Sequence, residues 1–320
     1  MLTFCLRRGL VAALLVLGVA SGALVLTRLA PGDGVDEGRM FDPAARAAER
    51  ARLGLDRPIA EQYVSWLAGA VRLDFGDSVL YSRPVAEMVG ERALNTAILA
   101  AAALALATLI GLPLGVYTGA HASGTGAAVA RGISTLLVSI PPLVGALLLV
   151  LVAARTGWFP AGGMTSVGGS ATWAAWVTDV LAHLPAPALA LALPLAATLE
   201  RLQSQALAEA VRQPFVDASR ARGVPAREVL TRHAWPVSLG PVLATYGFMI
   251  GSLFSGSFVV EVITAWPGLG RLMFDALRAR DLYLVAGTAA AGAACLAAGT
   301  LAADVAHARL DPRVRERHRP

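Results

Sequence analysis

The sequence contains no lysine, only two cysteines and few charged residues of any kind. A nucleotide-binding P-loop needs the lysine of GxxxxGKS/T to reach the β and γ phosphates. Because all 27 basic residues are arginine, the chain carries no such ATPase site and no lysine that could form a Schiff base. Cys5 and Cys295 lie before the first hydrophobic run and within the last one, so neither a disulfide framework nor a cysteine-based metal site is expected.

Charged residues make up 15% of the chain and hydrophobic residues 56%, against roughly 25% and 45–50% in an average soluble domain. A membrane-spanning helix needs about 20 predominantly apolar residues, because the hydrocarbon core is about 30 Å thick. Six stretches meet this requirement, and we therefore predict an all-α polytopic membrane protein. The predicted spans are residues 9–29, 95–118, 133–153, 180–198, 240–262 and 284–305.

Two of these spans carry features that argue against them. Arg7 and Arg8 precede the first span, as in a signal peptide, but its apolar run exceeds the roughly 7 to 15 residues of a cleaved signal, so we predict a membrane anchor. Pro185, Pro187 and Pro194 interrupt the fourth span. Membrane helices tolerate proline when neighbours satisfy the freed carbonyl groups, and this stretch is still predicted to span.

The distribution of arginine predicts the orientation, because cytoplasmic loops of membrane proteins carry an excess of basic residues. Arginines precede the first span, dominate residues 306–320 and outnumber the acids in residues 199–239. We therefore expect both termini and the 199–239 loop to be cytoplasmic. Residues 30–94 are then extracytoplasmic, and residues 36–52 within them are expected to form a surface helix.

Residues 212–225, within the 199–239 loop, predict a short helix with both ends marked. Pro214 suits the first helical turn, and Gly223 suits a left-handed stop. Asp217 near the start and Arg220 near the end complement the helix dipole.

Four residues of this helix share one stripe at i, i+3, i+4 and i+7 spacing, namely Phe215, Ala218, Ser219 and Arg222. Small side chains keep the stripe shallow, so the helix could enter a groove on another protein. The same pattern would suit a turn helix that lies on its own bundle. The residues alone leave both possibilities open.

The stretch resembles the EAA loop of binding-protein-dependent ABC permeases, whose pattern is E-A-A, three residues and then G. Asp217, Ala218, Ser219 and Gly223 occupy those positions. Asp replaces Glu, Ser replaces the second Ala, and of the family's later I-x-L-P only Pro236 is present. The dipeptide, oligopeptide and nickel branch of the family commonly departs in this way.

Short strings similar to those of that branch extend over nearly the whole chain, and their order and spacing together are specific. They are 29–33 (LAPGD), 53–58 (LGLDRP) with Gln62 and Tyr63, 75–78 (FGDS), 83–85 (RPV), Arg92 with Asn95 and Thr96, 139–141 (SIP), Glu261 before 266–270 (WPGLG), and 311–313 (DPR).

The resemblance implies the transmembrane domain of a type I ABC importer, acting as a permease subunit of an ATP-driven, binding-protein-dependent importer in the bacterial inner membrane. It also implies the domain organisation: 1–8 a cytoplasmic tail, 9–29 the first transmembrane helix, 30–94 an extracytoplasmic segment, 95–305 a permease core with five helices and the 199–239 coupling loop, and 306–320 a basic cytoplasmic tail. Di- or oligopeptides are the expected cargo, although relatives also carry nickel complexes, glutathione or sugars.

The family's permeases pair with a second, similar permease and with two cytoplasmic ATPase subunits, and an extracytoplasmic solute-binding protein delivers the substrate. Each EAA helix docks in a groove on an ATPase subunit. Carried over to this chain, the ATPase-coupling residues are Phe215, Val216, Asp217, Ala218, Ser219, Arg220, Ala221, Arg222 and Gly223. The chain itself is expected to be non-catalytic and to bind no cofactor, metal or nucleic acid, because the partner ATPase subunits hold ATP and magnesium.

One alternative function is an ATP-independent secondary transporter or channel. Such a protein would need acids at mid-membrane for proton or sodium coupling, and the predicted spans contain few. Glu261, near the external end of the fifth span, is expected either to face the translocation path, to pair with a neighbouring helix or to reach the interface. A membrane-embedded hydrolase is a second alternative, but no histidine lies at mid-membrane to act as its base.

Overall fold

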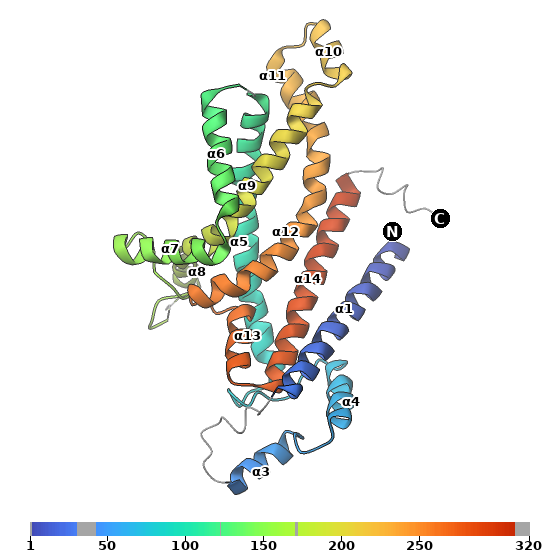
Figure 1. Ribbon diagram of the computed structural model, residues 1–320, viewed down its shortest axis with the longest axis vertical. Coiled ribbons are helices and arrows are strands. Elements are labelled where there is room, and N and C mark those ends of the chain that lie inside the picture. The colour runs from blue at the N-terminus through green and yellow to red at the C-terminus, as the bar shows by residue number, and fades with distance from the viewer. Residues whose placement is uncertain (1, 31–42, 122, 170–171, 311–320) are drawn as a thin grey trace. The chain divides into compact units, whose positions relative to one another are not determined.

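The structure is a computed structural model that describes residues 2–30, 43–121, 123–169 and 172–310 (Figure 1). These residues are largely helical and contain no β-strand beyond one isolated bridge between Asp77 and Pro84, which confirms the all-α prediction. The helices are α1 (Leu2–Leu29), α3 (Pro43–Arg52), α4 (Ile59–Ala70), α5 (Val85–Ala120), α6 (Thr125–Ser139), α7 (Pro142–Thr156), α8 (Trp173–His183), α9 (Pro185–Ala210), α10 (Pro214–Ala221), α11 (Ala226–Glu228), the π-helical turn η1 (Val229–Ala234), α12 (Trp235–Ile263), α13 (Leu269–Arg278) and α14 (Leu282–Leu310).

Four helical stretches in the described residues are long and apolar enough to cross a membrane. They are Arg8–Leu29, Val85–Ala120, Ala226–Ile263 and Leu282–Val305, and they contain the first, second, fifth and sixth predicted spans. The bent pairs α6 with α7 and α8 with α9 also qualify when each pair is counted as one span. The structure therefore holds four spans, or up to six.

A proline lies at each of the bends in the third and fourth predicted spans. The helices α6 and α7 meet at 104°, and between them Ile140 (φ −84°, ψ 115°) and Pro141 (φ −60°, ψ 144°) have extended backbones. Proline disfavours the helical conformation of the residue before it, so the chain turns here instead of continuing as the straight helix that a hydrophobic run suggests. The milder bend of 49° between α8 and α9 falls at Leu184, directly before Pro185, and there Leu184 keeps helical dihedrals (φ −67°, ψ −32°).

Some expectations fall wholly or partly outside the described residues. The predicted surface helix at 36–52 appears from Pro43 onward as α3, whereas residues 36–42 lie outside the described residues. The same holds for residues 31–33 of the LAPGD string, for the DPR string and for the tail from residue 311 onward.

The chain divides into two compact units, of which the first comprises residues 1–97 and 267–298. The buried carboxylate of Asp281 joins two distant parts of this unit. It accepts hydrogen bonds from the Ser78 hydroxyl (2.7 Å) and from the backbone N–H groups of Leu80 (3.0 Å) and Leu284 (3.1 Å). Asp281 thus caps the start of α14 and fixes the loop that follows α4.

Several of the family-like strings make hydrogen bonds within the first unit. The side chains of Arg92 and Asn95 on α5 donate to the Pro267 carbonyl oxygen (3.2 and 2.8 Å), and the Thr96 hydroxyl oxygen accepts from the Leu269 N–H (2.8 Å). These contacts hold the WPGLG turn at the start of α13. These residue types thus have a structural role in holding that turn.

The second unit comprises residues 98–266 and 299–320, and α9 lies at its centre. This helix packs against α12, α6 and α7 (Figure 1), and most of its residues are buried. Three glycines at four-residue spacing let α5 approach α9 without intervening side chains. A Cβ added to Gly111 would lie 2.5 Å from the Ala196 carbonyl oxygen, one at Gly115 would lie 2.7 Å from the Gln203 Cβ, and one at Gly119 would lie 2.7 Å from the Ser204 carbonyl oxygen.

We expect Gly115→Ala to lower the free energy of unfolding by about 1–3 kcal/mol, because the added methyl group overpacks the α5–α9 contact. Gly90→Ala is the matched control on the same helix, since its Cβ would meet nothing within 4 Å. The control should be neutral or more stable by roughly 0.5–1 kcal/mol. Thermal unfolding of the purified chain in detergent would measure both, and equal midpoints for the two variants would contradict the close approach.

Candidate functional site

The helix α10 lies between the end of α9 and the π-helical turn that leads into α12. It begins at Pro214, as predicted, and ends in a left-handed residue, Gly223, with φ of +80°. The Gly223 N–H donates to the Arg220 carbonyl oxygen (2.9 Å), and the Val224 N–H donates to that of Ser219 (3.3 Å). This pair of bonds is a Schellman motif, which satisfies the last carbonyl groups of the helix. Both predicted helix ends are confirmed.

One face of α10 is buried against its own bundle. Val216 has 0% of its surface exposed and Ser219 has 1%. Val216 packs in an apolar cluster built from the end of α9 and from η1, whose other buried members are Leu207, Ala210, Val229 and Ala234. The Ser219 hydroxyl donates to the Phe215 carbonyl oxygen (2.9 Å). Ser219 therefore does not belong to an exposed stripe with Phe215, Ala218 and Arg222, because the chain needs that side of the helix to cover its own apolar cluster.

The opposite face of α10 is exposed, and it carries most of the predicted coupling residues. These are Phe215, Asp217, Ala218, Arg220, Ala221, Arg222 and Gly223. Asp217 and Arg220 lie 3.6 Å apart as an ion pair, but both side chains are more than half exposed, so the pair contributes little to stability. The sequence left open whether this helix lies on its own bundle or is free to enter a groove on another protein. The buried face lies on the bundle, and the exposed face is free for such a contact.

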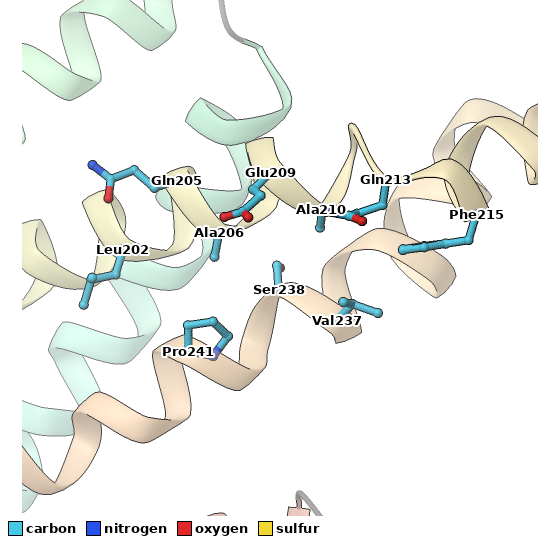
Figure 2. Close-up of a pocket in the computed structure, with 10 residues that line it drawn as sticks. All are labelled: Leu202, Gln205, Ala206, Glu209, Ala210, Gln213, Phe215, Val237, Ser238 and Pro241. Atoms are coloured by element: carbon cyan, nitrogen blue, oxygen red, sulfur yellow. The ribbon is translucent and has the colours of Figure 1, made fainter. Parts of the chain in front are cut away.

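A pocket of about 430 Å³ lies beside α10, where α9 and α12 diverge (Figure 2). Phe215 of α10 borders one side, and Ser238 and Pro241 of α12 face Ala206 of α9 across it (Figure 2). The remaining lining residues are Leu202, Gln205, Glu209, Ala210, Gln213 and Val237. The pocket is lined by apolar and amide side chains, the Ser238 hydroxyl and a single carboxylate, that of Glu209. Elsewhere too, the described part of the chain contains no group of three or more potential metal ligands.

Glu261 lies near the opposite end of α12 from α10 and is fully buried. The structure therefore does not bring it together with the predicted coupling residues. Its burial is consistent with the packing interpretation of this residue, and whether it faces a translocation path stays a prediction.

Sequence reasoning missed four buried polar residues next to this loop, namely Thr118, Glu200, Gln203 and Ser238. Glu200 lies two residues beyond the end of the fourth predicted span. If the helix is continued past residue 198, the side chains of Glu200 and Gln203 fall on the same side of it as the apolar residues of the fourth span. The hydrophobic run alone did not indicate that Glu200 and Gln203 are buried, because the run ends before these two residues.

Comparison with known families identifies the chain. Residues 111–316 match the family described as "binding-protein-dependent transport system inner membrane component", and residues 1–84 match its N-terminal companion. The chain belongs to this family. It is a multi-pass inner-membrane protein with the membrane-domain fold of type I ABC importers, and it acts as a permease subunit of an ABC transport system. The resemblance of residues 212–225 to the EAA loop of binding-protein-dependent ABC permeases therefore led to the correct family. The alternative of an ATP-independent transporter is set aside.

Two relatives show the extent of the similarity. The oligopeptide transport system permease protein AppB of Bacillus subtilis is 32% identical over 98% of this chain and 99% of its own length. The oligopeptide transport system permease protein OppB of Mycobacterium tuberculosis is 34% identical over 82% of each chain.

The two faces of α10 predict different reactivity toward a maleimide. In a variant without Cys5 and Cys295, Ala218→Cys should react quickly, and Ser219→Cys should react much more slowly because its side chain lies in the buried face. Reaction of the folded protein in detergent, followed by mass spectrometry, measures both rates. Denaturation is the control and should make the rates equal. Equally fast labelling of the two folded variants would show that α10 does not pack on the bundle.

Proposed function

We propose that this chain is one of two permease subunits of an importer for di- or oligopeptides. The names of its relatives support the cargo, since AppB and OppB are both named for oligopeptide transport. The partners we propose are a second, similar but distinct permease, two ATPase subunits and an extracytoplasmic solute-binding protein. ATP and magnesium would be held by the ATPase subunits, and this chain would be non-catalytic, in keeping with its lack of any P-loop lysine.

The observation that carries the coupling proposal is the two-faced helix α10. Its buried face, with Val216 and Ser219, fixes the helix to the end of α9. Its exposed face would enter a groove on an ATPase subunit, with Phe215, Asp217, Ala218, Arg220, Ala221, Arg222 and Gly223 as contact or shape-determining residues. Closure of the ATPases on ATP would then displace α10 and shift the bundle between inward-facing and outward-facing states, as alternating access requires.

The proposed orientation places both termini and the 199–239 loop in the cytoplasm, and residues 30–94 outside. Exposed arginines around α10, including Arg212, Arg220, Arg222 and Arg227, support this arrangement because basic residues are retained on the cytoplasmic side. The domain organisation predicted from the sequence, with a permease core over 95–305, stands as part of the same proposal. Glu261 remains a proposed residue of the translocation path.

Reconstitution tests the function. The chain would be incorporated into proteoliposomes with its partner permease and ATPases, and uptake of radiolabelled trialanine would be followed with and without ATP and the solute-binding protein. We expect uptake only when both are present. ATP hydrolysis stimulated by the binding protein without trialanine uptake would retain the ABC importer and reject this peptide as cargo. Uptake that is indifferent to ATP would contradict the coupling proposal.

Substitutions at the exposed side and end of α10 should uncouple uptake from ATP hydrolysis without preventing membrane insertion. Gly223→Val places a β-branched residue at a φ of +80°, which strains the helix end, and Asp217→Arg reverses a charge on the exposed face. Gly223→Asn and Asp217→Glu are the matched controls, because asparagine tolerates the left-handed region and glutamate keeps the charge. Wild-type uptake in both disruptive variants would refute this role for α10.

A further inference from the structure

Four buried polar side chains connect α9 to its neighbours within the second unit. The Thr118 hydroxyl on α5 donates to Oε1 of Glu200 on α9. One turn further along α9, Nε2 of Gln203 donates to the Ser238 hydroxyl on α12, at 2.8 Å. The exposed fraction of each of these side chains is 2% or less. We call this group, Thr118, Glu200, Gln203 and Ser238, the polar clamp.

The clamp is anchored further at both of its outer ends. The Ser238 hydroxyl donates to the Trp235 carbonyl oxygen (2.7 Å), so the hydrogen bond from Gln203 is directed at the first turn of α12. Nη1 of Arg131 on α6 donates to the backbone carbonyl oxygen of Thr118 (3.1 Å). Gly115 lies between the two arms of the clamp, where its missing side chain allows direct contact with the backbone of α9. Side-chain bonds and backbone contact therefore hold α9 in one position relative to α5 and α12.

The position of the clamp relates it to α10. Glu200 and Gln203 lie in the last turns of α9, which ends at Ala210, and α10 begins at Pro214. Ser238 lies in the first turn of α12, the helix that leaves the loop. The clamp thus fastens both the incoming and the outgoing arm of the α10 loop to one another and to α5. Ser238 also lines the pocket beside α10, so the clamp lies where α9 and α12 diverge.

Stability alone does not explain these residues. Oε2 of Glu200 and Oε1 of Gln203 are buried and have no hydrogen-bond partner in the structure. Leaving buried acceptors unpaired is costly, and apolar side chains of similar volume would avoid that cost. An ionisable residue in such a position is a functional candidate by default. What polar side chains supply and apolar ones do not is directional contact that specifies one arrangement of the helices.

We propose that Glu200 and Gln203 are positioning residues that transmit displacement of α10 to α5 and α12. The inference rests on the proposed function, because it assumes that α10 is the element the ATPases move. With the clamp intact, α9, α12 and α5 move together when α10 moves. Without it, α10 can shift while the helices that it leads into stay behind, so that ATP hydrolysis proceeds without a signal passing across the membrane domain.

The test uses the reconstituted complex of this chain with its partner permease, ATPases and solute-binding protein. The readout is the stimulation factor, which is the ATP hydrolysis rate with the binding protein divided by the rate without it. Glu200→Leu and Gln203→Leu should lower this factor by about threefold or more while the basal rate is kept. Ser238→Ala removes a single hydroxyl group and serves as a milder variant should the leucine variants fail to assemble.

Two control variants separate positioning from general packing. Glu200→Gln retains an oxygen that accepts from Thr118 and should preserve the stimulation factor. Tyr246→Phe deletes a different interhelical hydrogen bond, the 2.9 Å contact between the Tyr246 and Thr108 hydroxyl groups of α12 and α5, which does not involve α9, and should also preserve it.

The outcomes distinguish the clamp from the function on which it rests. Absence of stimulation in the wild-type complex would refute the proposed function itself. Wild-type stimulation in Glu200→Leu, Gln203→Leu and Ser238→Ala would overturn the clamp alone. An equal loss in Tyr246→Phe would also overturn it, because any weakening of the bundle would then have the same effect.

Discussion

The packing of Val216 against the apolar end of α9 determines what the loop between α9 and α12 presents to other proteins. Because this contact fixes the rotation of α10 about its own axis, Asp217, Ala218 and Arg220 are turned outward. The Schellman motif at Gly223 ends the helix after two turns and sends the chain back toward the bundle. A short exposed helix on a fixed base is suited to receive a displacement from another protein, which is the role proposed for α10.

In the first unit, hydrogen bonds order a segment that lies outside the spans, and its described residues contain no β-sheet. Its family-like strings contribute buried hydrogen bonds to this end. Asp281 holds the loop around Ser78, and the Tyr283 hydroxyl donates to the Leu53 carbonyl oxygen (2.7 Å). At the surface, a hydrogen bond from Arg52 to Glu49 (2.7 Å) lowers the pKa of the Glu49 carboxyl. Ser78 and Leu53, which lie in strings that resemble the family, thus take part in hydrogen bonds that stabilise local structure.

Much of the fold could be predicted from composition and helix-end residues. Hydrophobic runs located the spans, and Pro214 and Gly223 located the ends of α10, because both effects act within a few residues of the chain. The bend at Pro141 was missed, since a hydrophobic average over about 20 residues does not register one extended dipeptide. The burial of Ser219 could not be predicted, because helical spacing shows that it shares a stripe with Phe215, Ala218 and Arg222 but not which face the rest of the bundle covers.

The polar clamp could not be predicted for a related reason. Glu200 and Gln203 read as ordinary polar residues just beyond a span. The packing of α5, across Gly115, and of α12, through Ser238, surrounds them. These tertiary contacts link residues far apart in the sequence, 82 positions for Thr118 and Glu200 and 35 positions for Gln203 and Ser238. A helical register continued past the span places both residues on the apolar side of α9, but a single sequence does not show that Thr118 and Ser238 are their partners.

Site-specific cross-linking tests the central claim, that the exposed face of α10 contacts an ATPase subunit. Ala218→Cys would be labelled with a benzophenone maleimide in the assembled complex and irradiated, and the adduct would be identified by mass spectrometry. The account predicts an adduct with an ATPase subunit. Complete labelling of residue 218 without any adduct to an ATPase subunit, in a complex that still hydrolyses ATP, would contradict it.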